Sequence, residues 1–347
     1  MTAENTLLEV RNLRKYFPVR KGLLQRTVAQ IKAVDGVDLT IRTGETLGLV
    51  GESGCGKTTT GRTILRLVEP TGGEILFRGR SLAGDTDTAM TDVATASPAQ
   101  IKLLRRDMQI IFQDPYSSLD PRMTVGEIVG EPLQIQGLMS RSERMARVLD
   151  LLGAVGLSAD HARRYPHEFS GGQRQRIGIA RALALNPRLV VADEPVSALD
   201  VSVRAAVTQL LMEIQRTHGT TLILISHDLA LVRYVADSVV VMYLGQVMEA
   251  GTTGQVFSAP HHPYTEALLA AQPRLDGNQE PVAPVEGETP SPLEPPVGCP
   301  FHTRCPRKLG PICEAIRPPE QVTADGHRMA CHIPMAELAR VQEKVPA

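Results

Sequence analysis

The chain has almost no net charge, no long apolar run and no leader-like start. Its 37 basic residues nearly balance 38 acidic ones, for a formal net charge of −1, so a broad electrostatic attraction to nucleic acid is not expected. No apolar run approaches the ~18 residues that a membrane-spanning helix needs. The first residues, M-T-A-E-N-T, lack the basic and apolar regions of a signal peptide. We expect a cytosolic protein that reaches a membrane only by docking on a spanning partner.

Proline and cysteine are concentrated near the C-terminus. Six prolines fall within residues 281–296, which is typical of an extended linker. Four of the five cysteines follow this segment, and a reducing compartment argues against disulfides between them. At 347 residues the chain is long enough for a full core and a second, smaller unit, so we predict about two domains.

Residues 51–58 read G-E-S-G-C-G-K-T between a short apolar run and a helical pattern. The glycines let successive N–H groups point at one anion, and the following helix adds the positive end of its dipole. Lys57 can reach the β- and γ-phosphates, and the Thr58 hydroxyl can ligate Mg²⁺. Taken alone, the motif would also fit a glycine-rich turn. The predicted phosphate-binding residues are Gly51, Ser53, Gly54, Cys55, Gly56, Lys57, Thr58 and Thr59.

Local patterns predict the elements around this loop. Apolar and polar residues alternate between Leu8 and Ile41, which indicates an antiparallel β-region. The stretch Arg20–Gln30 interrupts the pattern and is expected to be a basic, exposed insertion. Residues 81–100 are small and polar and predict a loop, whereas residues 121–165 predict helices.

Two carboxylates follow a second apolar run, Leu189–Ala192, which has the length of a strand buried on both faces of a parallel sheet. Asp193 and Glu194 then lie at the carboxyl edge, which in an α/β sheet faces the phosphate loop. We expect Asp193 to hold Mg²⁺ through water and Glu194 to polarise an attacking water. Without a phosphate loop upstream, two solvent-exposed acids at a strand end would be the better interpretation.

Three further residues are candidates only because of this context. His227 ends the strand that follows and could contact the γ-phosphate or orient the water. Gln113 follows the apolar segment Met108–Phe112 and could sense Mg²⁺ or the γ-phosphate. Tyr16 could stack on adenine, although a lone tyrosine on a hairpin usually serves packing.

A second glycine-rich helix start lies at Phe169–Gln173, F-S-G-G-Q, and has the S-x-x-Q form of a capping box. One chain offers no second phosphate for it. The physical interpretation is that it serves the ATP of another subunit, with two subunits arranged head to tail. Its predicted nucleotide contacts are Ser170, Gly171, Gly172 and Gln173.

Together these residues resemble the ATP-binding cassette (ABC) family over roughly residues 7–260. The matching motifs are Walker A at 51–58, the Q-loop at Gln113, the signature at 169–173, Walker B at 189–194, the D-loop at 197–200 and the switch histidine at His227. Phe169 departs from the family's usual leucine. The resemblance implies an ATPase, converting ATP and water to ADP and phosphate in step with transport, with ATP and Mg²⁺ as cofactors.

The implied fold is α/β: a P-loop NTPase (RecA-like) core with an N-terminal antiparallel β subdomain and a helical insert, plus a small C-terminal Cys-rich extension. Residues 7–260 would form the nucleotide-binding domain, with the helical subdomain at about 114–168. Residues 261–297 would be a Pro-rich linker, and residues 298–347 the extension.

Several stretches look like the dipeptide and oligopeptide importer subgroup. They are Gln113–Pro121, Arg164–His167, Asp193–Ser202 and His262–Leu268. Residues 14–22 and the Pro-rich segment that ends at Pro296 are similar to the F-type ATPase subunit of that subgroup. The chain itself shows no peptide site.

This resemblance implies a homologous D-type ATPase subunit, two transmembrane permease subunits and, through the complex, an extracytoplasmic peptide-binding protein. No nucleic-acid partner is expected. The chain would lie at the cytoplasmic face of the plasma membrane as a peripheral subunit. Two alternatives stay open: an ATPase of a nickel or other small-solute importer, and a non-transport cassette ATPase. The single cassette and the lack of a long heptad run weigh against the second.

The four C-terminal cysteines are unevenly spaced, as Cys299-x5-Cys305-x7-Cys313-x17-Cys331, unlike the paired CxxC of a zinc ribbon. Four thiolates can bind Zn²⁺ or an iron–sulfur cluster. Some members of the subgroup carry a [4Fe–4S] cluster in this tail, and the resemblance favours that cluster over zinc. Four free thiols in a packed tail are the third alternative.

Overall fold

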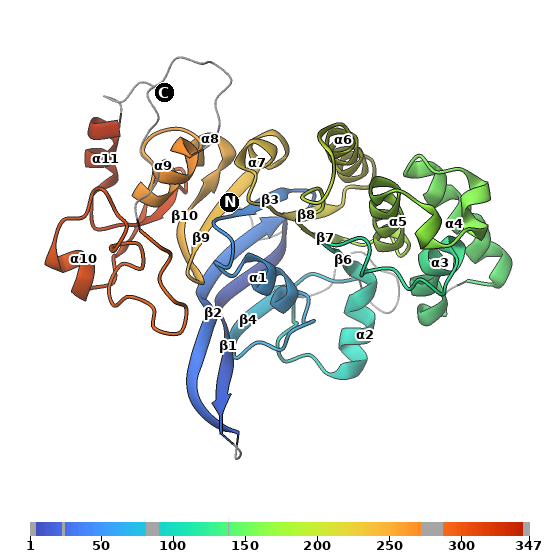
Figure 1. Cartoon of the computed structure of the whole chain (residues 1–347), viewed down its shortest axis with the longest axis horizontal. Coiled ribbons are helices and arrows are strands. Elements are labelled where there is room, and N and C mark those ends of the chain that lie inside the picture. The colour runs from blue at the N-terminus through green and yellow to red at the C-terminus, as the bar shows by residue number, and fades with distance from the viewer. Residues whose placement is uncertain (1–4, 23–24, 81–89, 138, 272–286, 343–347) are drawn as a thin grey trace. The chain divides into compact units, whose positions relative to one another are not determined.

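The computed structural model describes residues 5–22, 25–80, 90–137, 139–271 and 287–342 (Figure 1). It forms two compact units, each built from several separate segments of the chain. The described residues of the first unit come from Met1–Leu8, Thr40–Thr46 and Leu76–Ile225. Those of the second unit come from Glu9–Leu39, Leu47–Ile75 and Ser226–Ala347.

The second unit is built on the sheet whose strand β3 leads into the phosphate loop. β3 (Thr46–Val50) is fully buried and pairs in parallel with β9 (Ser238–Tyr243). β10 (Gln246–Thr252) returns antiparallel to β9. Beyond it lie β12 (Arg328–Ala330) and β11 (Glu320–Val322), both antiparallel to their neighbours. The C-terminal extension therefore shares a sheet with the strand that carries the phosphate loop.

The predicted antiparallel β-region is present in this unit as two long strands, β1 (Thr6–Lys21) and β2 (Arg26–Arg42), with β4 (Gly72–Phe77) on the other side of β1. The predicted interruption at Arg20–Gln30 is wrong, because both strands continue into it from either side. Its side chains are largely exposed, so a hairpin whose strands project past the core gives the same polar pattern as an insertion.

The first unit contains three parallel strands in the order β8-β7-β6. β7 (Leu189–Asp193) and β8 (Thr221–Ile225) are buried at every position, which explains their continuous apolar runs. β6 (Met108–Ile111) pairs with β7. Helix α5 (Gly171–Leu183) packs against β6 and against α6 (Val201–His218).

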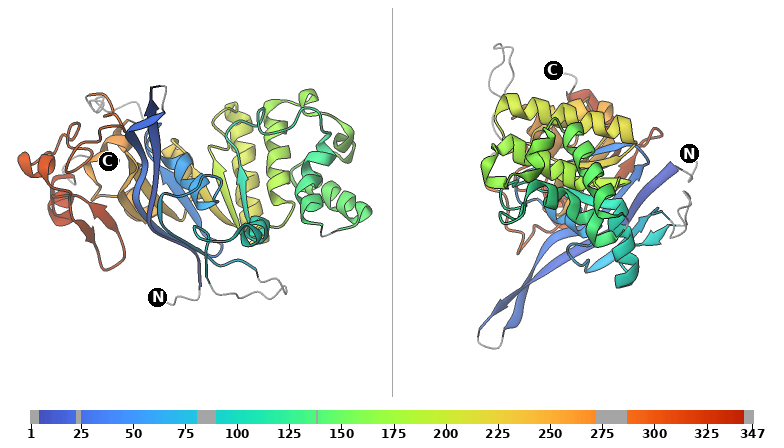
Figure 2. Two further views of the ribbon diagram at one scale, coloured as in Figure 1. Left: turned by 90° about the horizontal axis from the view of Figure 1, so that it is seen from below. Right: turned by 90° about the vertical axis from the view of Figure 1, so that its right-hand side faces the viewer.

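The helices predicted for residues 121–165 are present in the first unit. α3 (Val125–Gln136) begins at Thr124, whose hydroxyl accepts from the backbone N–H of Glu127 while that glutamate accepts from the Thr124 N–H. α4 (Arg141–Ala154) starts with the same type of box. Both helices lie beside α5, as Figure 1 and Figure 2 show. Two short 3-10 helices follow, Ala159–Arg163 and Pro166–Glu168.

The loop predicted for residues 81–100 is only partly correct. Residues 81–89 lie outside the described residues. After them come the short strand β5 (Thr91–Asp92) and helix α2 (Pro98–Asp107), which starts inside the predicted loop. Ser97 caps this helix, and its hydroxyl accepts from the Gln100 N–H. The proline that follows the cap belongs to the helix start and not to a loop.

The second unit also contains six helices among its described residues. They are α1 (Lys57–Ile64), α7 (Leu229–Val235), α8 (Thr253–Val256), α9 (Pro263–Ala270), α10 (Pro311–Ala315) and α11 (Met335–Gln342). α9 lies inside the segment predicted as a linker, residues 261–297, and the domain boundaries stay a prediction. In the described part of the chain, no helix is both long and apolar enough to cross a membrane.

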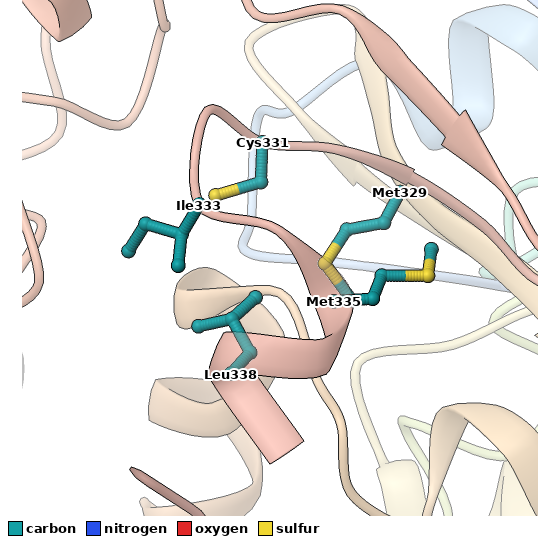
Figure 3. Packing of buried hydrophobic residues seen from close by; sticks show 5 residues of the cluster. All are labelled: Met329, Cys331, Ile333, Met335 and Leu338. Carbon is teal, nitrogen blue, oxygen red and sulfur yellow. The ribbon is translucent and has the colours of Figure 1, made fainter. Parts of the chain in front are cut away.

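Two apolar clusters anchor the C-terminal extension. One brings together Met329, Cys331, Ile333, Met335 and Leu338, all buried (Figure 3). The other is aromatic: Phe301 lies 5.4 Å from Tyr243 of β9 and 5.2 Å from Tyr264 of α9, measured between ring centroids. All three rings are fully buried. The extension is thereby packed into the second unit's core.

A buried histidine makes the stability of this unit sensitive to pH. His262 caps α9, and its Nδ1 accepts from the backbone N–H of Tyr264 at 3.0 Å. Burial lowers the pKa of His262 to about 4. An unfolded histidine has a pKa of about 6.5, so the unfolded chain binds more protons between roughly pH 6.5 and pH 4. Stability is therefore lost as the pH falls through that window.

We predict that the wild-type Tm drops between about pH 7 and about pH 5 by more than that of His262→Asn, because asparagine keeps a capping oxygen but does not titrate. Thermal unfolding across this range measures the difference. His167→Asn, at an exposed position, is the matched control. If Tm fell with pH equally in wild type and His262→Asn, the pH dependence could not be attributed to His262.

Candidate nucleotide site

The phosphate loop has a backbone path that only glycine allows at two of its positions. Gly51 has φ 144° and Gly56, the N-cap of α1, has φ 105°. A Cβ at Gly51 would lie 2.2 Å from the carbonyl oxygen of Met242, and one at Gly56 would lie 2.1 Å from that of Ala33. The loop thus lies directly against backbone from β9 and β2, which fixes its shape.

Lys57 is held inside this loop. Its ammonium donates to the carbonyls of Gly51 at 2.7 Å and Glu52 at 2.8 Å, and its side chain is buried. Cys55 lies beside it, with its Sγ 3.7 Å from Nζ, and burial raises the pKa of the Cys55 thiol. The thiol is neutral and packs under the loop.

The other predicted phosphate-binding residues differ in exposure. Ser53 and Gly54 are exposed, while Thr58 and Thr59 are half-buried in the first turn of α1. The Thr59 carbonyl accepts from the Thr63 hydroxyl, which is an ordinary helical contact. The loop therefore presents its middle to solvent and its lysine to the interior.

His227 lies near the end of the second unit's sheet at which β3 leads into the phosphate loop. Its predecessor Ser226 donates its N–H to the carbonyl of Leu49, the penultimate residue of β3, at 3.2 Å. His227 itself is exposed. The residue before His227 is thus bonded to the strand that leads into the phosphate loop, and the contact of His227 with a γ-phosphate stays a prediction.

Tyr16 is held by its hydroxyl, which donates a short hydrogen bond to Asp35. Arg317 of the extension donates to the same carboxylate at 2.9 Å. Burial by itself would raise the pKa of Asp35, but the hydrogen bonds from Tyr16 and Arg317 outweigh it, and the pKa falls below its ordinary value. The ring of Tyr16 is half-buried, so its orientation is set by these bonds.

In the first unit, the structure brings two predicted catalytic residues together. Asp193 is fully buried at the end of β7, and Glu194 follows it, half-buried. The amide Nε2 of Gln113, from the segment after β6, donates to Glu194 Oε2 at 3.1 Å. The parallel pairing of β6 and β7 explains this, because both chains leave the sheet at the same edge.

The backbone of Glu194 is strained. Its φ is 44°, a region that non-glycine residues occupy rarely. Its N–H donates to the carbonyl of Ile225 at 3.0 Å, and its carbonyl accepts from the Ser197 hydroxyl at 3.0 Å. Such a conformation costs about 1–3 kcal/mol and occurs preferentially at functional sites.

The predicted signature segment forms an exposed helix start. Ser170 caps α5: its hydroxyl accepts from the Gln173 N–H at 3.4 Å, and its own N–H donates to Gln173 Oε1 at 3.1 Å. Gly171 is exposed, whereas Gly172 is buried against α6. Phe169 is buried, with its ring edge-on to His161 at 5.2 Å. The departure from leucine at position 169 is thus absorbed in packing.

The structure does not assemble the predicted metal site from Cys299, Cys305, Cys313 and Cys331. In the described residues, which include all four, no three His, Cys, Asp or Glu side chains are arranged to hold a metal ion. Cys331 instead lies in the apolar cluster of Figure 3. The [4Fe–4S] expectation and its zinc alternative are therefore not supported.

Burial raises the pKa values of two of these thiols. It raises the pKa of Cys299 to about 11 and that of Cys305 to about 12, and the neighbouring cysteines add a smaller effect in the same direction. With pKa values raised this far, both thiols are neutral at neutral pH. The four cysteines share one region, but spacing along the chain cannot say where their side chains point.

Glu52 of the phosphate loop, and two residues that contact it, were missed from the sequence. The Glu52 N–H donates to the hydroxyl of Tyr264 at 2.8 Å, and the Glu52 carboxylate is paired with Arg304 at 2.7 Å. Tyr264 stood in one of the stretches that resemble peptide importers, without an assigned role. No pattern pointed to Arg304, because its partner lies 252 positions away.

Two family models match the chain. Residues 34–197 match the ABC transporter model, and residues 248–313 match the model of the oligopeptide/dipeptide transporter C-terminal region. The first covers the phosphate loop and the Asp193–Glu194 pair. The second covers α9 and the start of the extension.

Known proteins resemble the chain over most of its length. The oligopeptide transport ATP-binding protein AppF of Bacillus subtilis is 49% identical over 96% of this chain and 99% of its own length. The dipeptide transport ATP-binding protein DppF of Escherichia coli is 48% identical over 91% of each. Among solved structures, a dimeric post-hydrolysis state of the ATP-binding cassette MJ0796, bound to ADP and Pi, superposes with a TM-score of 0.60. It is 29% identical and covers 71% of this chain and 99% of MJ0796.

The α/β fold, the phosphate loop and the edge carboxylates define an ATPase of the ABC cassette class, as the sequence predicted. Within that class, the chain belongs to the ABC transporter ATP-binding proteins of the oligopeptide/dipeptide transporter family.

The packing of the signature helix can be tested at Gly172. A Cβ there would lie 2.3 Å from Cγ1 of Val203, whose branched side chain has little freedom, whereas a Cβ at Gly178 of the same helix meets nothing within 4 Å. We predict that Gly172→Ala costs ~1–3 kcal/mol of unfolding free energy through overpacking. Gly178→Ala should be neutral or gain about 0.5–1 kcal/mol. Denaturant unfolding compares the two; equal stabilities would contradict the described contact.

Proposed function

We propose that the chain is the ATP-hydrolysing subunit of a membrane importer for di- and oligopeptides. One observation carries the proposal: a complete set of cassette residues stands in the same chain as a C-terminal region that matches the oligopeptide/dipeptide transporter model. The near full-length similarity to AppF and DppF supports the same assignment. A nickel importer ATPase is the alternative in the same transport class.

Hydrolysis requires that a water attacks the γ-phosphorus while the bond to the bridging oxygen breaks and ADP leaves. Glu194 accepts a proton from this water, and Gln113, bonded to Glu194 at 3.1 Å, orients both. Lys57 gives up its loop carbonyls to bind the β- and γ-phosphates, and the N–H groups of residues 53–58 surround them. His227 contacts the γ-phosphate from the segment after Ser226.

The donor set suits Mg²⁺, which prefers oxygen ligands. In the first unit, Gln113 would hold the ion with its amide oxygen and Asp193 through water. The Thr58 hydroxyl of the second unit is the further ligand that the sequence predicts. When bound, Mg²⁺ neutralises charge that develops on the transferring phosphoryl group.

A second subunit completes each site. Ser170 and Gly171 stand exposed at the start of α5, where an approaching triphosphate can reach them. We assign this surface to the ATP of a homologous ATPase subunit arranged head to tail. The similar cassette MJ0796 is known as a dimer, which supports pairing of two such subunits. ATP then favours the closed pair, and hydrolysis removes the γ-phosphate that bridges the two chains.

The chain works at the cytoplasmic face of the membrane as a peripheral subunit. It would dock on two permease chains, with the helical region of α3 and α4 carrying motion to them. A peptide-binding protein on the other side would deliver the cargo. These partners are inferred from the family.

Glu194→Gln tests the hydrolytic role. The amide keeps the shape of the side chain but cannot accept the proton, so we predict that ATP binding persists while turnover falls by roughly 10²–10⁴-fold. Phosphate release under steady-state conditions measures turnover, and ATP-dependent dimer formation by gel filtration measures binding. Glu213→Gln, at an exposed carboxylate of α6 outside the cassette motifs, is the control. Wild-type turnover in Glu194→Gln would exclude the assigned role.

A further inference from the structure

Glu52, the second residue of the phosphate loop, is held by three different elements of the second unit. Its N–H donates to the hydroxyl of Tyr264 on α9 at 2.8 Å. Its carbonyl accepts from Lys57 on α1 at 2.8 Å. Its carboxylate accepts from Arg304 of the extension at 2.7 Å and from the Thr289 hydroxyl at 3.0 Å. The conformation at the start of the loop therefore depends on the extension.

Arg304 is well placed for this contact. Its side chain is only 8% exposed, and its backbone N–H donates to the carbonyl of Phe301, whose ring is buried between Tyr243 and Tyr264. The guanidinium also donates to the Tyr243 hydroxyl at 3.4 Å. Because an anchored turn presents it, Arg304 loses little further freedom when it binds Glu52.

The negative charge of Glu52 links the Glu52–Arg304 ion pair to ATP binding. A carboxylate in the phosphate loop repels a triphosphate that binds the same loop, and a partly buried carboxylate is poorly screened by solvent. The guanidinium at 2.7 Å cancels that charge. The pair also keeps the Glu52 carbonyl aligned with Lys57, the residue that meets the phosphates.

We propose that Arg304 of the C-terminal extension is a positioning residue for ATP binding, which neutralises Glu52 and holds the phosphate loop in the conformation that accepts the triphosphate. The inference rests on the ATPase function proposed above. It gives the extension a role in the nucleotide site of its own chain.

The test is the equilibrium affinity of the full chain for a fluorescent ATP analogue. Arg304→Gln is expected to weaken binding by roughly tenfold, the loss that a charge-assisted hydrogen bond typically represents. Part of this loss of affinity should disappear at high salt, because salt screens the Glu52 carboxylate that has lost its ion-pair partner. Arg304→Lys keeps the charge and should stay within about threefold of wild type.

The double variant Glu52→Gln/Arg304→Gln separates charge from structure. It leaves no uncompensated carboxylate, so it should recover most of the affinity that Arg304→Gln loses. Arg307→Gln is the matched control, since Arg307 forms a similar ion pair in the same extension, with Glu266 at 2.7 Å. This control should bind the nucleotide as wild type does. If Arg304→Gln fails to fold, the lysine and double variants carry the test.

Equal affinity of Arg304→Gln and wild type would overturn the inference. So would equal losses in Arg304→Gln and Arg307→Gln, or a double variant as weak as Arg304→Gln, because each result would indicate general damage to the extension. Lys57→Ala serves as the reference for lost phosphate contacts. A wild-type chain that binds no nucleotide would refute the proposed function itself, which is a distinguishable result.

Discussion

The close approach of the phosphate loop to surrounding backbone is the constraint on which the second unit depends. Gly51 and Gly56 let the loop lie against the carbonyls of Met242 and Ala33, where any Cβ would clash. That contact places the loop between β9 and β2 and leaves Lys57 facing inward. The shape of the anion site is thus set before a nucleotide arrives, and preorganisation of this kind reduces the cost of binding.

The C-terminal extension belongs to this arrangement. Its strand β12 pairs with β10 in the sheet that contains β3, its Phe301 completes an aromatic cluster with Tyr243 and Tyr264, and its Arg304 reaches Glu52. Apolar packing and one partly buried ion pair therefore tie the tail to the loop. The sequence predicts a separate C-terminal extension, whereas in the structure this extension belongs to the unit that contains the phosphate loop.

The cassette motifs could be predicted because each one is local. A glycine-rich loop, a capping box or two acids after an apolar run is recognisable within a few residues. The pairing of β6 with β7 brings Gln113 to Glu194, a contact that the motifs alone did not predict. Contacts between distant segments could not be predicted. Arg304 has no pattern that marks it as the partner of Glu52, and uneven cysteine spacing does not reveal that Cys331 packs among methionines and leucine. The projecting β1–β2 hairpin was misread because exposed strands and exposed loops have similar composition.

The measurement that tests the central claim most directly is uptake of a radiolabelled dipeptide by cells that lack this chain and are complemented with either the wild type or Glu194→Gln. The account predicts that wild type restores uptake, that Glu194→Gln does not, and that nickel uptake is the same in all strains. Dipeptide uptake that persists without the chain, or nickel uptake that follows it, would contradict the assignment as a peptide-importer ATPase.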